Sequence, residues 1–393
     1  MRHSHRSVFF SLLTIFVLVG ELAAPALRTS ASATAPVEMQ SMPGQLVYFY
    51  AAHTDQPAPK IPPPADFLQQ RANGVRTQTA TITVNYNPGF SPEAQAAFQF
   101  AVDIWTSLIT SPVPITVDAY WTPLPTGVLG GAGSLDHEVN FAGVPMADTG
   151  YPVAIANKWA GTDLEPGDYD VEADFNSNFP DWYFGTDGNT PLDKWDFASV
   201  VLHELGHGLG FTGSMRVGGY CGSGNGCWGV ISHGFLTGYP AIYDRFAVNG
   251  LGQPLISSFA NYSAELASQL TSSNIYFNGP NAVKANGSSN VSLYAPNPWR
   301  QGSSYAHLGE IFNGTPNALM TFSISNGESL HNPGPVMLCM FKDMGWTVAV
   351  SGSSAASASV ASAPGFTAFS PDNVTVMVTE TLYLPLIMNG GVC

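Results

Sequence analysis

The 393-residue sequence contains little charge: Asp, Glu, Lys and Arg make up 10% of it, and only 13 residues are Lys or Arg. Its formal net charge is −15. Nucleic-acid binding needs clustered cations that displace counterions from phosphates, so this composition argues against a nucleic-acid partner. Apolar residues reach 45%, which is enough for a sizeable core and argues against global disorder.

Long apolar runs are missing beyond the start of the chain. Val8–Gly20 is apolar and follows a basic beginning, but at about a dozen residues it is too short to span a bilayer comfortably. Ala24–Ala26 and Ala31–Ala33 both fit the small-residue pattern of a cleavage site. We therefore predict a signal peptide over 1–33, a secreted protein, and no stable membrane insertion after signal removal. The alternative is an anchor that is never cut.

Cysteine is also scarce, with four residues and no CxxC spacing, so the cysteines do not form a zinc site. An even number in an exported chain indicates disulfides. Cys221 and Cys227 bracket a short glycine-rich loop, and Cys339 with Cys393 would attach the end of the chain to the domain. We predict both bridges.

Composition divides the chain into four parts. Residues 34–75 are rich in Pro and Ala and read as an extension or propeptide. They contain no cysteine, so they cannot silence a metal site by thiolate ligation. The part with alternating and helical patterns is 76–348, with a polar insertion over about 214–300. A Ser/Ala linker and a short tail follow over 349–393, with an apolar, strand-like piece at 382–388.

Within 76–348, two helices have clear beginnings. Ser91 is a typical N-cap with Pro92 at the first helical position, and Asp196 is a typical N-cap for a helix that runs through His207 and ends near Gly208. Other elements are expected as strands at 81–86, 114–121 and 171–175, and as helices at 265–270 and 336–344.

The second helix carries the motif His203-Glu204-Leu205-Gly206-His207. Residues four apart on a helix share a face, so His203 and His207 can present nitrogens to one metal ion. Zinc at such a site lowers the pKa of a bound water toward ~7, and Glu204 is placed to act as general base and then acid in hydrolysis. We therefore predict His203 and His207 as zinc ligands and Glu204 as the catalytic residue.

A catalytic zinc site needs a third protein ligand. The candidates in the rest of the chain are His233, Asp244, Glu265, His307 and His331. A glutamate ligand such as Glu265 would make the protein a gluzincin-type peptidase. Gly210 matches the glycine of the metzincin pattern HExxHxxGxxH, but Gly213 stands where that pattern has its last histidine.

The sequence at this point resembles the leishmanolysin-like metzincins, in which an insertion separates the active-site helix from the third histidine. The matching segments are Ser303–Leu308, Asn317–Thr321 and Phe341–Trp346, the last containing a D-x-G-aromatic motif. The resemblance covers roughly residues 80–347. It implies that His307 is the third zinc ligand and that Met320 is the Met-turn residue, an apolar floor under the metal.

The resemblance also implies an α+β fold: a metzincin-like zinc protease domain with a twisted, mostly parallel sheet, an active-site helix and a C-terminal helical subdomain. The implied function is a secreted zinc-dependent metalloendopeptidase that hydrolyses internal bonds of protein or peptide substrates. The strand at 171–175 would line the cleft and pair with an extended substrate. The sequence leaves the oligomeric state open.

Three alternatives remain beside this function. An exported surface or binding protein could keep the motif as a structural zinc site, a gluzincin-type peptidase would use Glu265, and a hydrolase of the same chemistry could act on something other than protein. A second metal is a further hypothesis, because a local acidic cluster could hold Ca²⁺. It consists of Asp163, Glu165, Asp168, Asp170 and Asp174.

Overall fold

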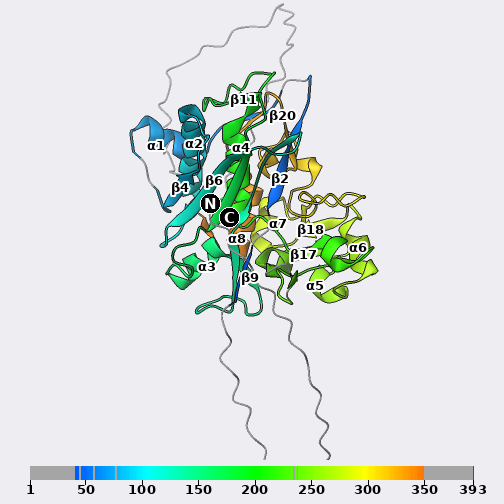
Figure 1. The fold of residues 1–393 in the computed structure, drawn as a ribbon. Coiled ribbons are helices and arrows are strands. Elements are labelled where there is room, and N and C mark those ends of the chain that lie inside the picture. The colour runs from blue at the N-terminus through cyan, green and yellow to red at the C-terminus, as the bar shows by residue number, and fades with distance from the viewer. Residues whose placement is uncertain are drawn as a thin grey trace, which may run out of the picture. The chain divides into compact units, whose positions relative to one another are not determined.

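The structure is a computed structural model that describes residues 40–43, 46–55, 58–75, 78–232, 235–236, 238–348 and 393 (Figure 1). For 40–43, 231–232 and 235–236 only the backbone is described. Internal contacts divide the chain into Met1–Val37 and Glu38–Cys393, and all described residues belong to the second unit. The predicted signal peptide, the Ser/Ala linker and the piece at 382–388 lie outside the described residues. Among the described residues, no helix is long and apolar enough to cross a membrane.

A six-stranded sheet forms the centre of the fold (Figure 1). Its order is β20 (Ser323–Ser325), β2 (Val47–Ala52), β7 (Val128–Ser134), β10 (Val171–Asn176), β6 (Ile115–Thr122) and β4 (Ile82–Tyr86). Strand β7 is antiparallel to β2 and β10, and the other three pairs are parallel. This mixed sheet together with eight α-helices in the described part of the chain agrees with the predicted α+β class.

Two long helices, α2 (Pro92–Leu108) and α4 (Phe197–Gly208), pack against each other, and α4 also lies against β7 and β10. Both predicted N-caps are confirmed: the Ser91 side chain accepts a hydrogen bond from Ala94 N, and Asp196 accepts one from Ser199 N. Trp105 on α2 is buried, and its indole N–H donates to the carbonyl of Leu202 at 3.0 Å. Helix α4 is thus anchored by its cap and by α2.

The segment 34–75 differs from the prediction, because part of it is built into the domain. Val47–Ala52 is strand β2, inside the main sheet, and its Val47 and Phe49 are buried. Helix α1 (Ala65–Ala72) buries Phe67, and β3 (Lys60–Ile61) pairs with β21 (Ser329–Leu330). The prolines lie on either side of β2 and not within it. The Pro and Ala content of the whole segment therefore did not predict this short strand, in which buried and half-buried residues alternate. Removal of this segment as a propeptide remains a prediction.

Smaller sheets surround the central one. Strands β1 (Gln40–Pro43), β8 (Asp136–Val139) and β9 (Gly150–Pro152) form one of them, next to helix α3 (Val153–Ala160). Four two-stranded pairs join β11 (Trp182–Tyr183) to β12 (Trp195–Asp196), β13 (Arg216–Val217) to β14 (Gly226–Cys227), β15 (Ile231–Ser232) to β16 (Phe235–Leu236), and β22 (Thr347–Val348) to β5 (Ile109–Thr110).

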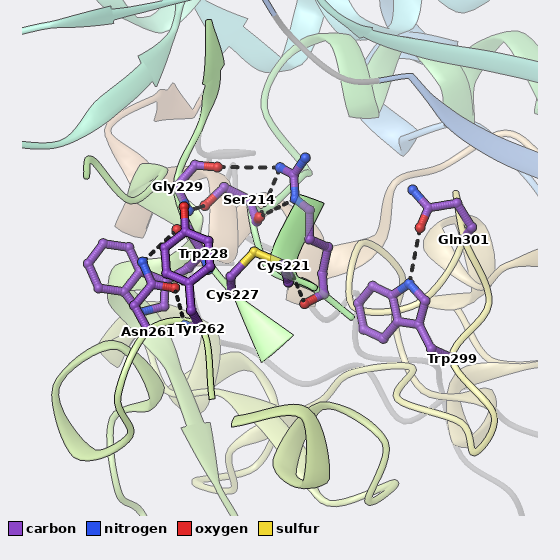
Figure 2. The surroundings of a disulfide bond; sticks show 10 residues. Ser214, Cys221, Cys227, Trp228, Gly229, Asn261, Tyr262, Trp299 and Gln301 are labelled. Carbon is purple, nitrogen blue, oxygen red and sulfur yellow. Dashed lines mark hydrogen bonds between the residues drawn. A yellow bond between two sulfur atoms is a disulfide. The ribbon is translucent and has the colours of Figure 1, made fainter. Parts of the chain in front are cut away.

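The predicted insertion, about 214–300, has its own three-stranded sheet of β17 (Ala247–Asn249), β18 (Ile275–Phe277) and β19 (Val291–Ser292). It also carries α5 (Leu255–Ser258), α6 (Ala264–Leu270) and α7 (Pro280–Ala285). Figure 2 shows the predicted Cys221–Cys227 disulfide near its beginning. Beside it, Asn261 exchanges two hydrogen bonds of 2.9 Å with the backbone of Trp228. The described residues of the polar insertion therefore form a folded part of the domain.

The last helix, α8 (Gly334–Met344), carries Cys339, and the predicted Cys339–Cys393 disulfide is present. The D-x-G-aromatic motif that follows has two structural roles. The Asp343 carboxylate accepts hydrogen bonds from Asn281 N and Ala282 N at the start of α7. The Trp346 indole N–H donates to the carbonyl of Leu209 at 2.9 Å. The motif therefore joins α8 to the insertion and to the end of α4.

Candidate metal centre

Helix α4 brings His203 and His207 onto one face, one turn apart, with ring centroids 4.7 Å apart. All 12 residues of α4 are buried, so both imidazoles project into the interior. After Gly208 the chain turns back, with the amide of Phe211 donating to the carbonyl of Gly206 at 3.0 Å. This turn returns the carbonyl of Phe211 to Nδ1 of His207, at 2.7 Å.

The third histidine of the group is His307, one hundred residues beyond His207. Its backbone is held by the amide of Tyr294, which donates to the His307 carbonyl at 2.9 Å. Its Nε2 lies 3.3 Å from Nε2 of His207, which in turn lies 2.9 Å from Nε2 of His203. The structure thus brings together the three predicted ligands, all fully buried, as a group that could hold a metal ion.

Backbone carbonyls determine how these rings are oriented. Nδ1 of His203 lies 2.6 Å from the carbonyl of Leu319, and Nδ1 of His307 lies 2.7 Å from that of Ser303. The contact of His207 with Phe211 is of the same kind. A carbonyl can only accept, so each Nδ1 carries the ring proton and each Nε2 presents a lone pair. Such an outer hydrogen bond is what metal-bound histidines make.

Three lone pairs directed at each other repel unless a cation lies among them. Two nitrogens at 2.0–2.1 Å from a tetrahedral zinc are separated by about 3.3 Å; the Nε2 atoms of His207 and His307 match this at 3.3 Å, and those of His207 and His203 are somewhat nearer, at 2.9 Å. The donor type, the separations and the tautomers therefore all fit a bound metal ion. Which metal it is does not follow from these three features.

Burial keeps the three imidazoles neutral. It lowers the pKa of His203 and of His207 well below 6.5, and the neighbouring histidines of the group lower both further. Burial also lowers the pKa of His307, to about 4. A neutral imidazole is the form that ligates a metal, so the folded site is prepared for binding without losing protons at neutral pH.

Glu204 lies on the same helix and points toward the sheet. Its side chain packs against Gly130 of β7, where a Cβ atom would come within 3.1 Å of the Glu204 carboxylate. It is fully buried and its two oxygens lack a well-formed hydrogen bond, although the backbone of Ala132 and Phe49 lies near enough to lower its pKa somewhat. Burial dominates and raises that pKa well above 4.5. Such a group is suited to holding and transferring a proton.

Met320 is also buried and lies beneath α4 between the two helical ligands. A Cβ atom at Gly206 would come 3.1 Å from the Met320 sulfur, so this side chain is in contact with the middle of the motif. The Met320 carbonyl accepts a hydrogen bond of 2.8 Å from Leu308 N, beside His307. Its neighbour Leu319 supplies the carbonyl that orients His203. The segment therefore supports two of the three histidines.

The other candidate ligands have different places. Asp244 is buried and accepts hydrogen bonds from Ser214, the amide of Ala241 and the Tyr305 hydroxyl. Glu265 is exposed in the first turn of α6. His331 contacts the Asp196 carboxylate at 3.0 Å and so supports the start of α4. His233 lies outside the described residues.

Two expectations outside the histidine group differ from the structure. Strand β10 cannot pair with a substrate, because β6 occupies one of its edges and β7 the other. Strand β7 was not predicted, since three of its seven residues are glycine, a residue depleted in strands.

The acidic residues proposed as a Ca²⁺ site do not point at one common position, because the Asp170 carboxylate accepts hydrogen bonds from Thr116 and Asn157. Among the described residues, the only group of three or more suitable ligands is the histidine group.

Sequence reasoning also missed Phe49, whose ring stacks on the ring of His203 with centroids 3.6 Å apart. The neighbouring Tyr48 is half-buried near Asp174, and burial raises the pKa of its hydroxyl. Burial likewise raises the pKa of Asp174, to about 6. The available signal was the run of strand-favouring residues over Val47–Ala52. It was given less weight than the Pro and Ala content of the segment around it.

Comparison with known families adds little to this geometry. A protein-family model described as SPBPB7E8-like matches residues 146–220, which include the whole of α4. That stretch is less than half of the chain, and the description states no activity. No curated protein matches the chain.

Proposed function

We propose that this protein is a secreted zinc-dependent metalloendopeptidase, similar to the leishmanolysin-like metzincins. The observation that carries the proposal is the convergence of three buried imidazole nitrogens beside a buried carboxylate on the same helix. Three nitrogen ligands that leave one position free are the donor set of catalytic zinc sites. The two disulfides support export, because such bonds persist mainly in oxidising compartments.

In this proposal His203, His207 and His307 hold the zinc, and their bonds to backbone carbonyls keep the rings in place. When bound, zinc supplies a Lewis acid that polarises a peptide carbonyl and lowers the pKa of water toward ~7. Glu204 takes the proton from the attacking water and passes it to the leaving nitrogen. Its raised pKa favours holding the proton between the two steps.

A structural zinc site in a surface or binding protein is less well supported. Structural sites close the metal with four protein ligands, and in the described residues the group has three. A buried carboxylate without a well-formed hydrogen bond is also costly, and a structural site has no use for it. A gluzincin arrangement is disfavoured because Glu265 is exposed on α6.

The test compares Glu204→Ala with Glu265→Ala in zinc content and casein hydrolysis, both measured in a form of the chain that itself hydrolyses casein. We expect Glu204→Ala to keep about one zinc per chain and to lose hydrolysis by a factor of about 10² or more, the usual contribution of a general acid–base. Glu265→Ala is the matched control, an exposed glutamate on another helix, and should leave both quantities unchanged.

Two results would count against the proposal. If Glu204→Ala alters neither zinc nor hydrolysis, the structural zinc site becomes the better account. If zinc is lost in Glu265→Ala, the gluzincin arrangement replaces the three-histidine group. Hydrolysis of a small ester or amide with no action on casein would instead indicate a hydrolase of other substrates.

A further inference from the structure

Strand β2 is hydrogen-bonded between β7 and β20 in the central sheet. It is antiparallel to β7, from Val47 opposite Ala132, and parallel to β20, from Tyr50 opposite Ser323. Two further backbone hydrogen bonds hold it: the amide of Tyr48 donates to the carbonyl of Gly302 at 2.9 Å, and that of Tyr50 donates to the carbonyl of Phe322 at 3.2 Å. A single extended segment is thus paired along both of its edges.

This segment covers the metal centre. Phe49 is fully buried, and its ring lies flat on His203 with an interplanar angle of 8°. The ring of Tyr48 lies against Gly131 of β7, on the same strand that contacts Glu204. The three histidines and Glu204 have no exposed surface at all. With β2 in place, no polypeptide substrate can reach the four residues.

The hydrogen bonds that orient the three histidines do not come from the segment that covers them. The carbonyls that orient the histidines come from Leu319, Phe211 and Ser303, all far from β2 in the sequence. Helix α4 has its own cap at Asp196 and packs on α2, β7 and β10 as well as on β2. Departure of β2 would therefore leave the ligands in place and free the edges of β7 and β20.

We propose that residues 47–52 occupy the slot in which an extended polypeptide substrate binds, so that this chain is a self-blocked precursor. The proposal rests on the peptidase function proposed above. A substrate would take the direction of β2, antiparallel to β7 and parallel to β20, because strand addition uses the backbone groups that β2 now satisfies. The slot thus favours extended chains over folded segments.

Strand β2 blocks the site through the Phe49 ring and through its backbone pairing. The Phe49 ring lies within 3.6 Å of the His203 ring, between centroids, and so occupies the space above this ligand. With this ring stacked on His203 and the backbone of β2 paired on both edges, a second extended chain has no room at this position. The block uses an aromatic ring and backbone pairing, and no cysteine, since all four cysteines of the chain are in disulfides.

The experiment compares Tyr50→Pro with Tyr50→Val in the full zinc-loaded chain. Proline removes the amide that donates to Phe322, whereas valine keeps that amide and suits a strand. Two rates are measured: casein hydrolysis, and removal of zinc by phenanthroline. We expect both to rise about tenfold or more in Tyr50→Pro and to stay near wild type in Tyr50→Val. The synthetic peptide of residues 46–54, added in trans, should slow hydrolysis by Tyr50→Pro again.

Phe49→Ala is the second variant, in case Tyr50→Pro does not fold; circular dichroism decides this. It uncovers His203, and zinc removal should again accelerate. The proposal is overturned if the folded variants hydrolyse casein and release zinc at wild-type rates. Hydrolysis that is already full in wild type and lost in Glu204→Ala leaves the peptidase function intact and refutes the block. If zinc removal is faster in the variants but none of them hydrolyses casein, β2 does cover the metal centre and the peptidase function is refuted.

Discussion

At the scale of single residues, the histidine group depends on backbone carbonyls for its orientation. Leu319, Phe211 and Ser303 each accept from one Nδ1, at 2.6–2.7 Å. No carboxylate takes part in these three contacts, and the carbonyl hydrogen bonds, which raise the pKa of each histidine, are smaller effects than burial. Burial then acts with little opposition, and it lowers the pKa of every histidine of the group.

These shifts predict how zinc binding responds to acid. For His307 the pKa falls from 6.5 to about 4, so within that window the folded site stays unprotonated where an exposed histidine would take up a proton. Protons therefore compete weakly with zinc until the pH approaches the lower value. We expect dialysed protein to keep its zinc at about pH 5.5 and to lose it toward pH 4.

Atomic absorption on the dialysed protein measures this retention, and circular dichroism at each pH shows that the chain is still folded. Zinc loss centred near pH 6.5 in folded protein would contradict the account, because it would indicate exposed ligands with ordinary pKa values.

At the scale of elements, segments with a clear local signal were predictable: the strands expected at 81–86, 114–121 and 171–175 are β4, β6 and β10, and the two capped helices are present. Ser91 and Asp196 predict the starts of α2 and α4, because the first amides of a helix need a side-chain acceptor. Strands β2 and β7 were not predicted. Their identity depends on neighbours in the sheet: glycines in β7 leave room for Tyr48 and Glu204, and no local propensity records such a contact.

The cap of α4 should matter more for stability than the cap of α2. Asp196 is fully buried and also contacts the Thr190 hydroxyl and His331, whereas Ser91 has one capping contact at the domain surface. We expect Asp196→Ala to lower the free energy of unfolding by about 2–4 kcal/mol, and Ser91→Ala by about 1 kcal/mol. Urea denaturation measures both; equal effects would contradict the role given to Asp196.

At the scale of the whole molecule, the metal centre is assembled from distant parts of the chain. The motif on α4 predicted two ligands and the base, because both spacing and chemistry are local there. His307 could be selected only through the family resemblance, since spacing alone also left His233, Asp244, Glu265 and His331 open. The covering strand β2 was beyond prediction, because its position follows from the pairing of three segments far apart in sequence.

The zinc content of His307→Ala, compared with wild type and with His53→Ala, tests the central claim most directly. His53 is an exposed histidine that contacts Trp195 edge-on and serves as the control. We predict about one zinc per chain in wild type and in His53→Ala, and a loss of most of it in His307→Ala. Undiminished zinc in a folded His307→Ala, or no zinc in wild type, would contradict the account of a three-histidine metal centre.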